Sequence, residues 1–166
     1  MNLMRPISAR LRFPAVSLRT ALMLVAMGLI SFASSCSDPQ SEIAKAANDG
    51  DLATVKALLK SNPRLVFDKD MYDTTPLHWA AQMGHKDVAE LLLANGAEVN
   101  ARNKYGDTPL HFAASGGSKD VVEVLLAHGA EVNIVDRPPI SETPLQSAAS
   151  RGHRDIVELL RQHGGR

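Results

Sequence analysis

The chain has 166 residues, enough for one domain, and it carries 18 basic and 18 acidic residues. The charge is unevenly distributed, because residues 1–35 contain four arginines and no acidic residue. From Cys36 onward the formal charge is therefore 14 minus 18, or −4. A chain with this charge lacks the basic face that nucleic-acid binding requires, so we expect no nucleic-acid partner.

The first 35 residues have the order of an export signal. Four basic residues come first, and they are Arg5, Arg10, Arg12 and Arg19. An apolar run follows at residues 21–32, and it is shorter than the ~20 residues that a transmembrane helix needs. We therefore predict that residues 1–35 are a secretory signal segment and take no part in the fold.

Cys36 follows this apolar run and three small residues, Ala33, Ser34 and Ser35. The pattern resembles the lipobox of bacterial lipoproteins and implies a lipid anchor at Cys36. As the single cysteine it cannot form a disulfide within the chain. The residue after the cysteine is Ser37, and this position resembles that of lipoproteins located in the outer rather than the inner membrane. An ordinary signal-peptidase site is the alternative, and it would release a soluble periplasmic or secreted protein.

The remainder of the chain is an internal repeat, preceded by a short linker at residues 36–40. Residues 75–107 read TPLHWAAQMGHKDVAELLLANGAEVNARNKYGD, and most of this stretch returns 33 residues later. The last copy starts at Thr143, and a diverged first copy starts at Ser41. The Thr-Pro-Leu-His-x-Ala motif, followed by Gly-His-x-Asp-Val and a Leu-Leu pair, resembles the ankyrin repeat. It implies an all-α solenoid of stacked helix-turn-helix pairs joined by hairpin-like loops, with repeats at about 41–74, 75–107, 108–142 and 143–166.

The first copy is expected to form a terminal repeat. Ser41 is placed to cap its first helix, and Leu52 to begin the apolar stripe of its second. Lys45 occupies the position of the aromatic residues Trp79 and Phe112 in later copies. A charged residue here suits a repeat whose outer face meets water.

The second and third copies carry the complete pattern. Their threonines are placed to cap short helices, and Trp79 and Phe112 are expected to pack between helices, with an interface anchor as the alternative role for Trp79. In the loop of the first copy Asp73 replaces the turn glycine, and Asp tolerates a left-handed conformation. The loop that precedes Thr143 has two extra residues and two prolines, so we expect it to differ in shape from the others.

The polar side chains indicate no catalytic or metal site. Because His78 and His111 recur at the repeat spacing, they are expected to lie about 8–10 Å apart, too far to share a metal. The ankyrin resemblance implies that they form hydrogen bonds within and between repeats. No Walker or dinucleotide-binding motif occurs, and the Ser, His and Asp residues fall at caps and turns. We therefore expect no enzymatic activity, metal or cofactor.

The positions that vary between copies predict the function. In ankyrin proteins a partner protein meets the loop tips and the exposed side of the short helices. Those positions hold Met71, Tyr72, Thr74, Gln82, Met83, Lys104, Tyr105, Asp107, Ser115 and Arg151. Several of them are aromatic or apolar, which suits protein recognition, although scattered exposed apolar residues are also common.

The sequence thus predicts a monomeric, non-catalytic protein-interaction module of the bacterial cell envelope that faces the periplasm. Its partner is another protein, and Cys36 links it to the membrane. Two alternatives remain at this point. One is a structural protein that associates with itself, and the other is a cytoplasmic ankyrin protein with an uncleaved N-terminal anchor.

Overall fold

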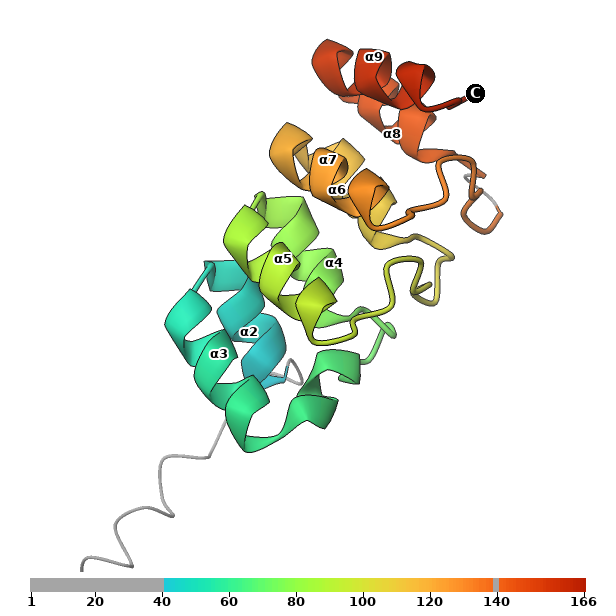
Figure 1. The fold of residues 1–166 in the computed structure, drawn as a ribbon. Coiled ribbons are helices and arrows are strands. Elements are labelled where there is room, and N and C mark those ends of the chain that lie inside the picture. The colour runs from blue at the N-terminus through green and yellow to red at the C-terminus, as the bar shows by residue number, and fades with distance from the viewer. Residues whose placement is uncertain (1–40, 139–140) are drawn as a thin grey trace, which may run out of the picture. The chain divides into compact units, whose positions relative to one another are not determined.

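The computed structural model describes residues 41–138 and 141–166, and the predicted signal segment, Cys36 and the linker lie outside this part of the chain. The described residues form eight α-helices and one 3-10 helix, with no strand among them (Figure 1). These elements are α2 (Glu42–Asp49), α3 (Leu52–Ser61), η1 (Pro63–Phe67), α4 (Pro76–Met83), α5 (Lys86–Ala94), α6 (Pro109–Gly116), α7 (Lys119–Ala127), α8 (Pro144–Ser150) and α9 (Arg154–Gln162). The predicted all-α ankyrin architecture is confirmed.

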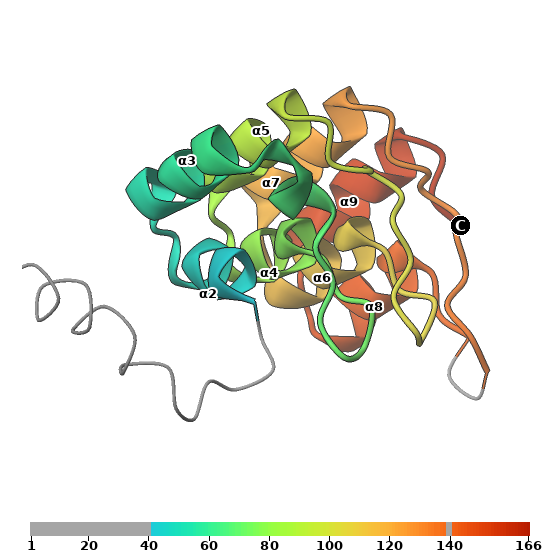
Figure 2. The same cartoon turned by 90° about the horizontal axis from the view of Figure 1, so that it is seen from below.

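The helices form two layers, because each repeat contributes one helix to each. In the first layer α4 packs between α2 and α6, and α6 packs between α4 and α8. In the second layer α5 packs between α3 and α7. Figure 2 shows the two rows of helices, and the loops that join the repeats project beyond one end of them. The short helices of the first layer therefore share one side with these loops.

The core consists of aliphatic side chains at equivalent positions of successive repeats. Leu92, Leu125 and Leu160 are fully buried, and each lies in the second helix of its own repeat. Burial of one such side chain contributes roughly 1.5–3 kcal/mol. Since a single helix pair cannot cover its own apolar face, neighbouring repeats stabilise each other.

Leu52 does not belong to this core, contrary to the expectation from its apolar stripe. It is 39% exposed and occupies the first position of α3. The first positions of α5, α7 and α9 hold Lys86, Lys119 and Arg154, which are also exposed. The position faces solvent in every repeat, so the apolar residue does not change its environment.

Trp79 and Phe112 are only partly buried, so their predicted place between helices is right in part. The Trp79 ring on α4 meets the Phe112 ring on α6 edge to face, with centroids 6.2 Å apart and an interplanar angle of 88°. Among the described residues Trp79 Nε1 is the one buried side-chain nitrogen or oxygen without a hydrogen-bond partner. The two aromatic rings thus join neighbouring repeats while part of each stays accessible.

Three loops join the repeats, and we call them finger 1 (residues 68–74), finger 2 (97–107) and finger 3 (130–142, with 139–140 outside the described residues). Each closes through a backbone hydrogen bond at its base, from Asp70 to Thr74, Asn103 to Asp107, and Asp136 to Glu142, at 3.0–3.1 Å. Asp73 has a φ of 61°, which confirms the left-handed turn expected in finger 1. In finger 3 the two extra residues lie within the loop and leave its base closed.

Candidate functional site

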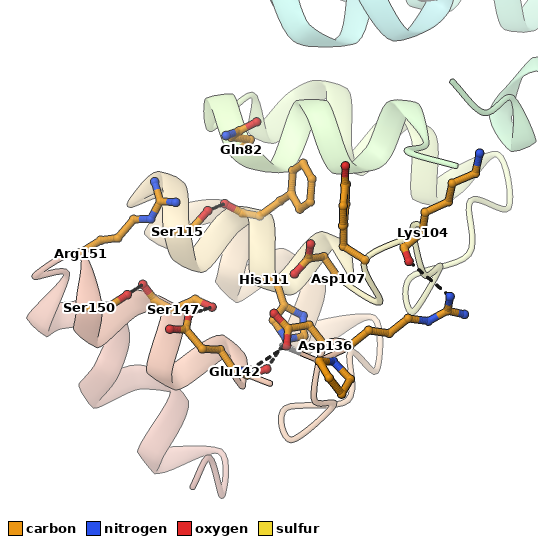
Figure 3. Close-up of a pocket in the computed structure, with 14 residues that line it drawn as sticks. Gln82, Lys104, Asp107, His111, Ser115, Asp136, Glu142, Ser147, Ser150 and Arg151 are labelled. Atoms are coloured by element: carbon orange, nitrogen blue, oxygen red, sulfur yellow. Dashed lines mark hydrogen bonds between the residues drawn. The ribbon is translucent and has the colours of Figure 1, made fainter. Parts of the chain in front are cut away.

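A groove lies between fingers 2 and 3 and the short helices α4, α6 and α8 (Figure 3). Its volume is about 570 Å³, within the range of ligand and peptide sites. We call it the finger groove. It is lined by Gln82, Lys104, Tyr105, Asp107, His111, Phe112, Ser115, Asp136, Arg137, Pro138, Glu142, Ser147, Ser150 and Arg151.

The structure brings six of the ten predicted contact residues together in this groove. They come from three successive repeats and are Gln82, Lys104, Tyr105, Asp107, Ser115 and Arg151. Met71, Tyr72 and Met83 do not line the groove, but their side chains are exposed as expected. Six of the variable positions therefore form one continuous region, and Tyr72 adjoins it through its contact with Tyr105.

Thr74 is the exception, because its predicted exposure is wrong. It is only 3% exposed. Its N–H donates to Asp70 Oδ1 at 2.9 Å, and its carbonyl accepts the Asp70 N–H at 3.1 Å. Thr74 thus closes the base of finger 1. Asp107 has the equivalent place in finger 2, but its longer, charged side chain reaches the groove.

An aromatic pair occupies the tips of fingers 1 and 2. The rings of Tyr72 and Tyr105 stack with centroids 5.9 Å apart and an interplanar angle of 29°. They remain 47% and 57% exposed. The Lys104 N–H donates to the Tyr72 carbonyl at 2.8 Å, and the Lys104 ammonium donates to the Met71 carbonyl at 2.6 Å. These bonds hold the two fingers together, so the pair is ordered before any partner arrives.

Finger 3 is joined to finger 2 in the same way. The Arg137 N–H donates to the Tyr105 carbonyl at 2.6 Å, and the Arg137 guanidinium donates to the Lys104 carbonyl at 3.3 Å. The wall of the groove is therefore a set of linked loops. Less conformational entropy is lost on binding to such a wall than on binding to free loops.

Two histidines attach the fingers to the helices. Nδ1 of His78 accepts the Thr75 N–H at 3.1 Å and lies 2.8 Å from the Thr75 hydroxyl. Since Nδ1 is the acceptor, Nε2 carries the proton and donates to the Asp107 carbonyl at 3.2 Å. His111 repeats this arrangement with Thr108 and the Glu142 carbonyl. The predicted structural role of both histidines is confirmed.

Both rings are neutral because they are buried. Burial lowers the pKa of His78 to about 4, and it lowers the pKa of His111 as well. With both nitrogens used, neither ring is available as a base or a metal ligand. Their effect on the groove is to place the backbone of Asp107 and Glu142, which brings two carboxylates to its floor.

The other histidines also make structural hydrogen bonds. His85 contacts the Asn48 carbonyl at 3.0 Å, and His153 contacts the Ser115 carbonyl at 3.2 Å, both in the preceding repeat. His128 and His163 contact carbonyls of their own helices. Within residues 41–138 and 141–166, no three His, Cys, Asp or Glu side chains are grouped as a metal site.

Three carboxylates gather at the floor of the groove. Asp136 Oδ1 accepts the Glu142 N–H at 2.7 Å, Glu142 Oε2 accepts the Ser147 hydroxyl at 3.3 Å, and Asp107 Oδ2 accepts the Asn103 amide at 3.4 Å. Burial raises the pKa of Asp107, and the negative charges of the other two carboxylates add to the increase. The ion pair found in the described residues, between Lys86 and Glu90 at 3.9 Å, lies outside the groove.

Two of these three carboxylates were not predicted from the sequence. Asp136 keeps the 33-residue register and matches Asn103, which is not among the predicted contact positions. Glu142 follows the inserted residues of finger 3, where this register is lost. Aligning the finger bases instead of the sequence numbers matches Glu142 to Asp107, which was predicted.

Comparison with protein families agrees with this architecture. A family model described as ankyrin repeats (many copies) matches residues 43–93, 77–126 and 117–161, which together span more than half of the chain. The chain therefore belongs to the ankyrin-repeat family, as the motifs indicated. Membership implies binding to another protein, and this fold is typically a non-catalytic interaction module.

Curated relatives share the repeats over part of their length. The chain is 38% identical over 78 residues to the probable E3 ubiquitin-protein ligase XBOS32 of Oryza sativa subsp. japonica, covering 44% of this chain and 15% of that protein. It is 40% identical over 62 residues to the ankyrin repeat domain-containing protein 49 of Homo sapiens, covering 37% and 26%.

A human ion channel gives a third match. The transient receptor potential cation channel subfamily A member 1 is 40% identical over 70 residues, covering 41% of this chain and 6% of the channel. In the described part of this chain, no helix is long and apolar enough to cross a membrane. Since this chain covers only 6–26% of each of these three proteins, the matches identify the repeat rather than a shared activity.

Proposed function

We propose that this chain is a non-catalytic protein-interaction module that binds a partner protein through the finger groove and the finger tips. One observation carries the proposal. Six positions that vary between the sequence repeats line a single groove made by three repeats. A preformed groove with aromatic, charged and polar side chains suits a protein segment.

The stacked tyrosines extend this surface beyond the groove. Tyr105 belongs to both regions, since it lines the groove and packs on Tyr72 at the neighbouring finger tip. Exposed, ordered aromatic side chains are enriched at the centres of protein interfaces. We therefore assign the main contact energy to Tyr105 and its neighbours.

A crosslinking pull-down from envelope fractions tests this assignment. The wild-type chain should retain a partner that the Tyr72→Ala, Tyr105→Ala double variant does not retain. Phe67→Ala is the matched control, because Phe67 is an exposed aromatic residue of η1 outside the groove. Equal retention of the partner by the double variant would reject the surface, provided that its melting temperature matches that of the control.

We further propose that the protein is a lipoprotein of the bacterial cell envelope, anchored at Cys36, facing the periplasm and located at the outer membrane. The support comes from the sequence, in which arginines, a short apolar run and small residues precede the single cysteine. Several acyl chains on one residue would anchor the protein stably.

Mass spectrometry of the protein isolated from its host tests the anchor. The expected result is a chain that begins at an acylated Cys36. A bare Cys36, or a chain that retains residues 1–35, would contradict the proposal. Neither result would affect the groove, so the location and the binding function are tested separately.

A further inference from the structure

We propose that the finger groove recognises an arginine side chain of the partner protein, held beside the rings of Tyr105 and Phe112 and facing the carboxylates of Asp107, Asp136 and Glu142. This inference rests on the proposed function, because it names the chemistry of the segment that the groove would bind. The shape of the groove, its aromatic lining and the carboxylates of its floor all support this ligand.

Three carboxylates line the groove floor, and the ion pair of the described residues involves none of them. The three carboxylates come from the bases of fingers 2 and 3, and none of them forms an ion pair there. Asp107 is half-buried, so its charge is poorly solvated. A cation bound among the three carboxylates in this partly dehydrated site is attracted by each of them.

Two of the three basic residues that line the groove donate to backbone carbonyls instead of to these carboxylates. The Lys104 ammonium donates to the Met71 carbonyl, and the Arg137 guanidinium donates to the Lys104 carbonyl. Figure 3 shows Lys104 and Arg151 toward opposite ends of the groove, with the labelled acidic residues between them. The resulting pattern is a negative centre with positive ends. It favours a segment with one central basic residue and disfavours a segment with several.

The aromatic lining distinguishes arginine from lysine. Tyr105 and Phe112 both line the groove, and Phe112 is supported from behind by edge-to-face contacts with His78 and Trp79 at 5.0 and 6.2 Å. A planar guanidinium stacks on aromatic rings and binds carboxylates with two parallel hydrogen bonds. An ammonium group has neither property, so arginine fits the combined lining better.

A peptide-display selection on the purified full chain tests the proposal without knowledge of the natural partner. Peptides that bind the groove are recognised as those that lose binding to Ser150→Trp, because Ser150 is an exposed lining residue and tryptophan would fill the groove. We expect these peptides to share one arginine at a fixed position. Replacing it by lysine should weaken binding, and replacing it by alanine should weaken binding further.

Asp107→Asn tests whether the preference for arginine depends on the carboxylates of the groove. The substitution keeps the size of the side chain and the backbone carbonyl that accepts from His78. It should lower the affinity of the arginine peptides at least about tenfold, as removal of one partner of a shielded charge pair does. Glu131→Gln, an exposed carboxylate outside the groove, is the matched control and should leave the affinity unchanged.

The possible outcomes separate this inference from the proposed function. Groove-binding peptides without a fixed arginine, or arginine peptides that bind Asp107→Asn as well as the wild type, would overturn the arginine site and leave the binding module intact. A selection that yields no peptide sensitive to Ser150→Trp would overturn the groove as a protein-binding site, and the arginine site with it.

Discussion

Fingers 2 and 3 close in the same way but differ in what they carry. At each base the side chain of the first residue accepts a backbone N–H from the last, Asn103 from Asp107 at 2.9 Å and Asp136 from Glu142 at 2.7 Å. The loop between them is two residues longer in finger 3. The comparison shows that the base fixes the finger to the repeat stack, while the segment beyond the base is free to change length and charge.

Fingers 2 and 3 are both attached to the helices by a histidine, but the two histidines differ in burial. His78 binds the base of finger 2 and is fully buried, whereas His111 binds the base of finger 3 and is slightly more accessible.

Acidification should destabilise the protein through His78. Its pKa is about 4 in the fold and about 6.5 in the unfolded chain, so the unfolded state takes up a proton first as the pH falls. The contribution of neutral His78 to the free energy of unfolding is therefore fully present above pH 6.5. It decreases by about 3 kcal/mol as the pH falls to 4. Urea unfolding followed by the fluorescence of Trp79, the single tryptophan, measures it.

His78→Gln is the control for this pH dependence. Gln146 already replaces the histidine in the last repeat, where its Oε1 accepts the Thr143 N–H at 2.8 Å. The variant should keep the cap of α4 and lose most of the decrease in stability between pH 6.5 and 4. The decrease that remains should come in part from His111, whose pKa is also lowered by burial. A pH profile equal to the wild type would show that His78 is not the titrating group.

Removing the side chain that closes the base of finger 2 should lower the free energy of unfolding more than removing the one that closes finger 3. Asn103 is 4% exposed, and its Oδ1 accepts two backbone N–H groups, from Tyr105 and Asp107, each at 2.9 Å. Asn103→Ala should lower the free energy of unfolding by about 2 kcal/mol, because two donors lose their partner. Asp136→Ala removes one such bond and should cost about 1 kcal/mol. Equal losses in urea unfolding would contradict the difference.

The turn of finger 2 should not tolerate a side chain. Gly106 has a φ of 88°, and a Cβ added there would lie 2.9 Å from the backbone nitrogen of Arg137 in finger 3. Gly106→Ala should therefore cost about 1–2 kcal/mol from the left-handed conformation alone. Thermal unfolding measures this loss, and a melting temperature equal to the wild type would mean that the fingers are not closely packed.

The corresponding turn of finger 3 should gain from glycine. Ser141 has a φ of 57°, a conformation that glycine adopts more readily than serine. Ser141→Gly should raise the free energy of unfolding by up to about 0.5 kcal/mol, since part of the gain is offset by the flexibility of glycine in the unfolded chain. A loss of stability would show that the serine side chain supports the finger.

Most of the fold could be predicted from the sequence because its determinants recur at a fixed spacing. The threonine caps, the TPLH histidines and the buried leucines each recur at equivalent positions, although the Thr143 hydroxyl donates to the Arg166 carbonyl where Thr75 and Thr108 contact a histidine. The exposure of Leu52 could not be predicted, because apolar character alone does not give its side of the helix.

The site was predictable only where the repeat register holds. Tyr105 and Asp107 could be placed because finger 2 has the regular length. Glu142 could not, since the insertion shifts its number while the hydrogen bonds at the base keep the geometry. Asp136 keeps the register, but its counterpart Asn103 is a buried residue of the finger base and was not a predicted contact. The exposure of Thr74 was predicted wrongly because the register gives the position of a residue in the finger but not whether its side chain extends to the surface.

Binding of the partner in the finger groove is tested most directly by filling the groove. The measurement is the affinity of the captured partner for the full-length chain that carries Ser150→Trp. Ser150→Trp should weaken binding at least about tenfold, while Phe67→Ala should leave it unchanged. If the partner binds Ser150→Trp as tightly as the wild type, the groove is not its binding site.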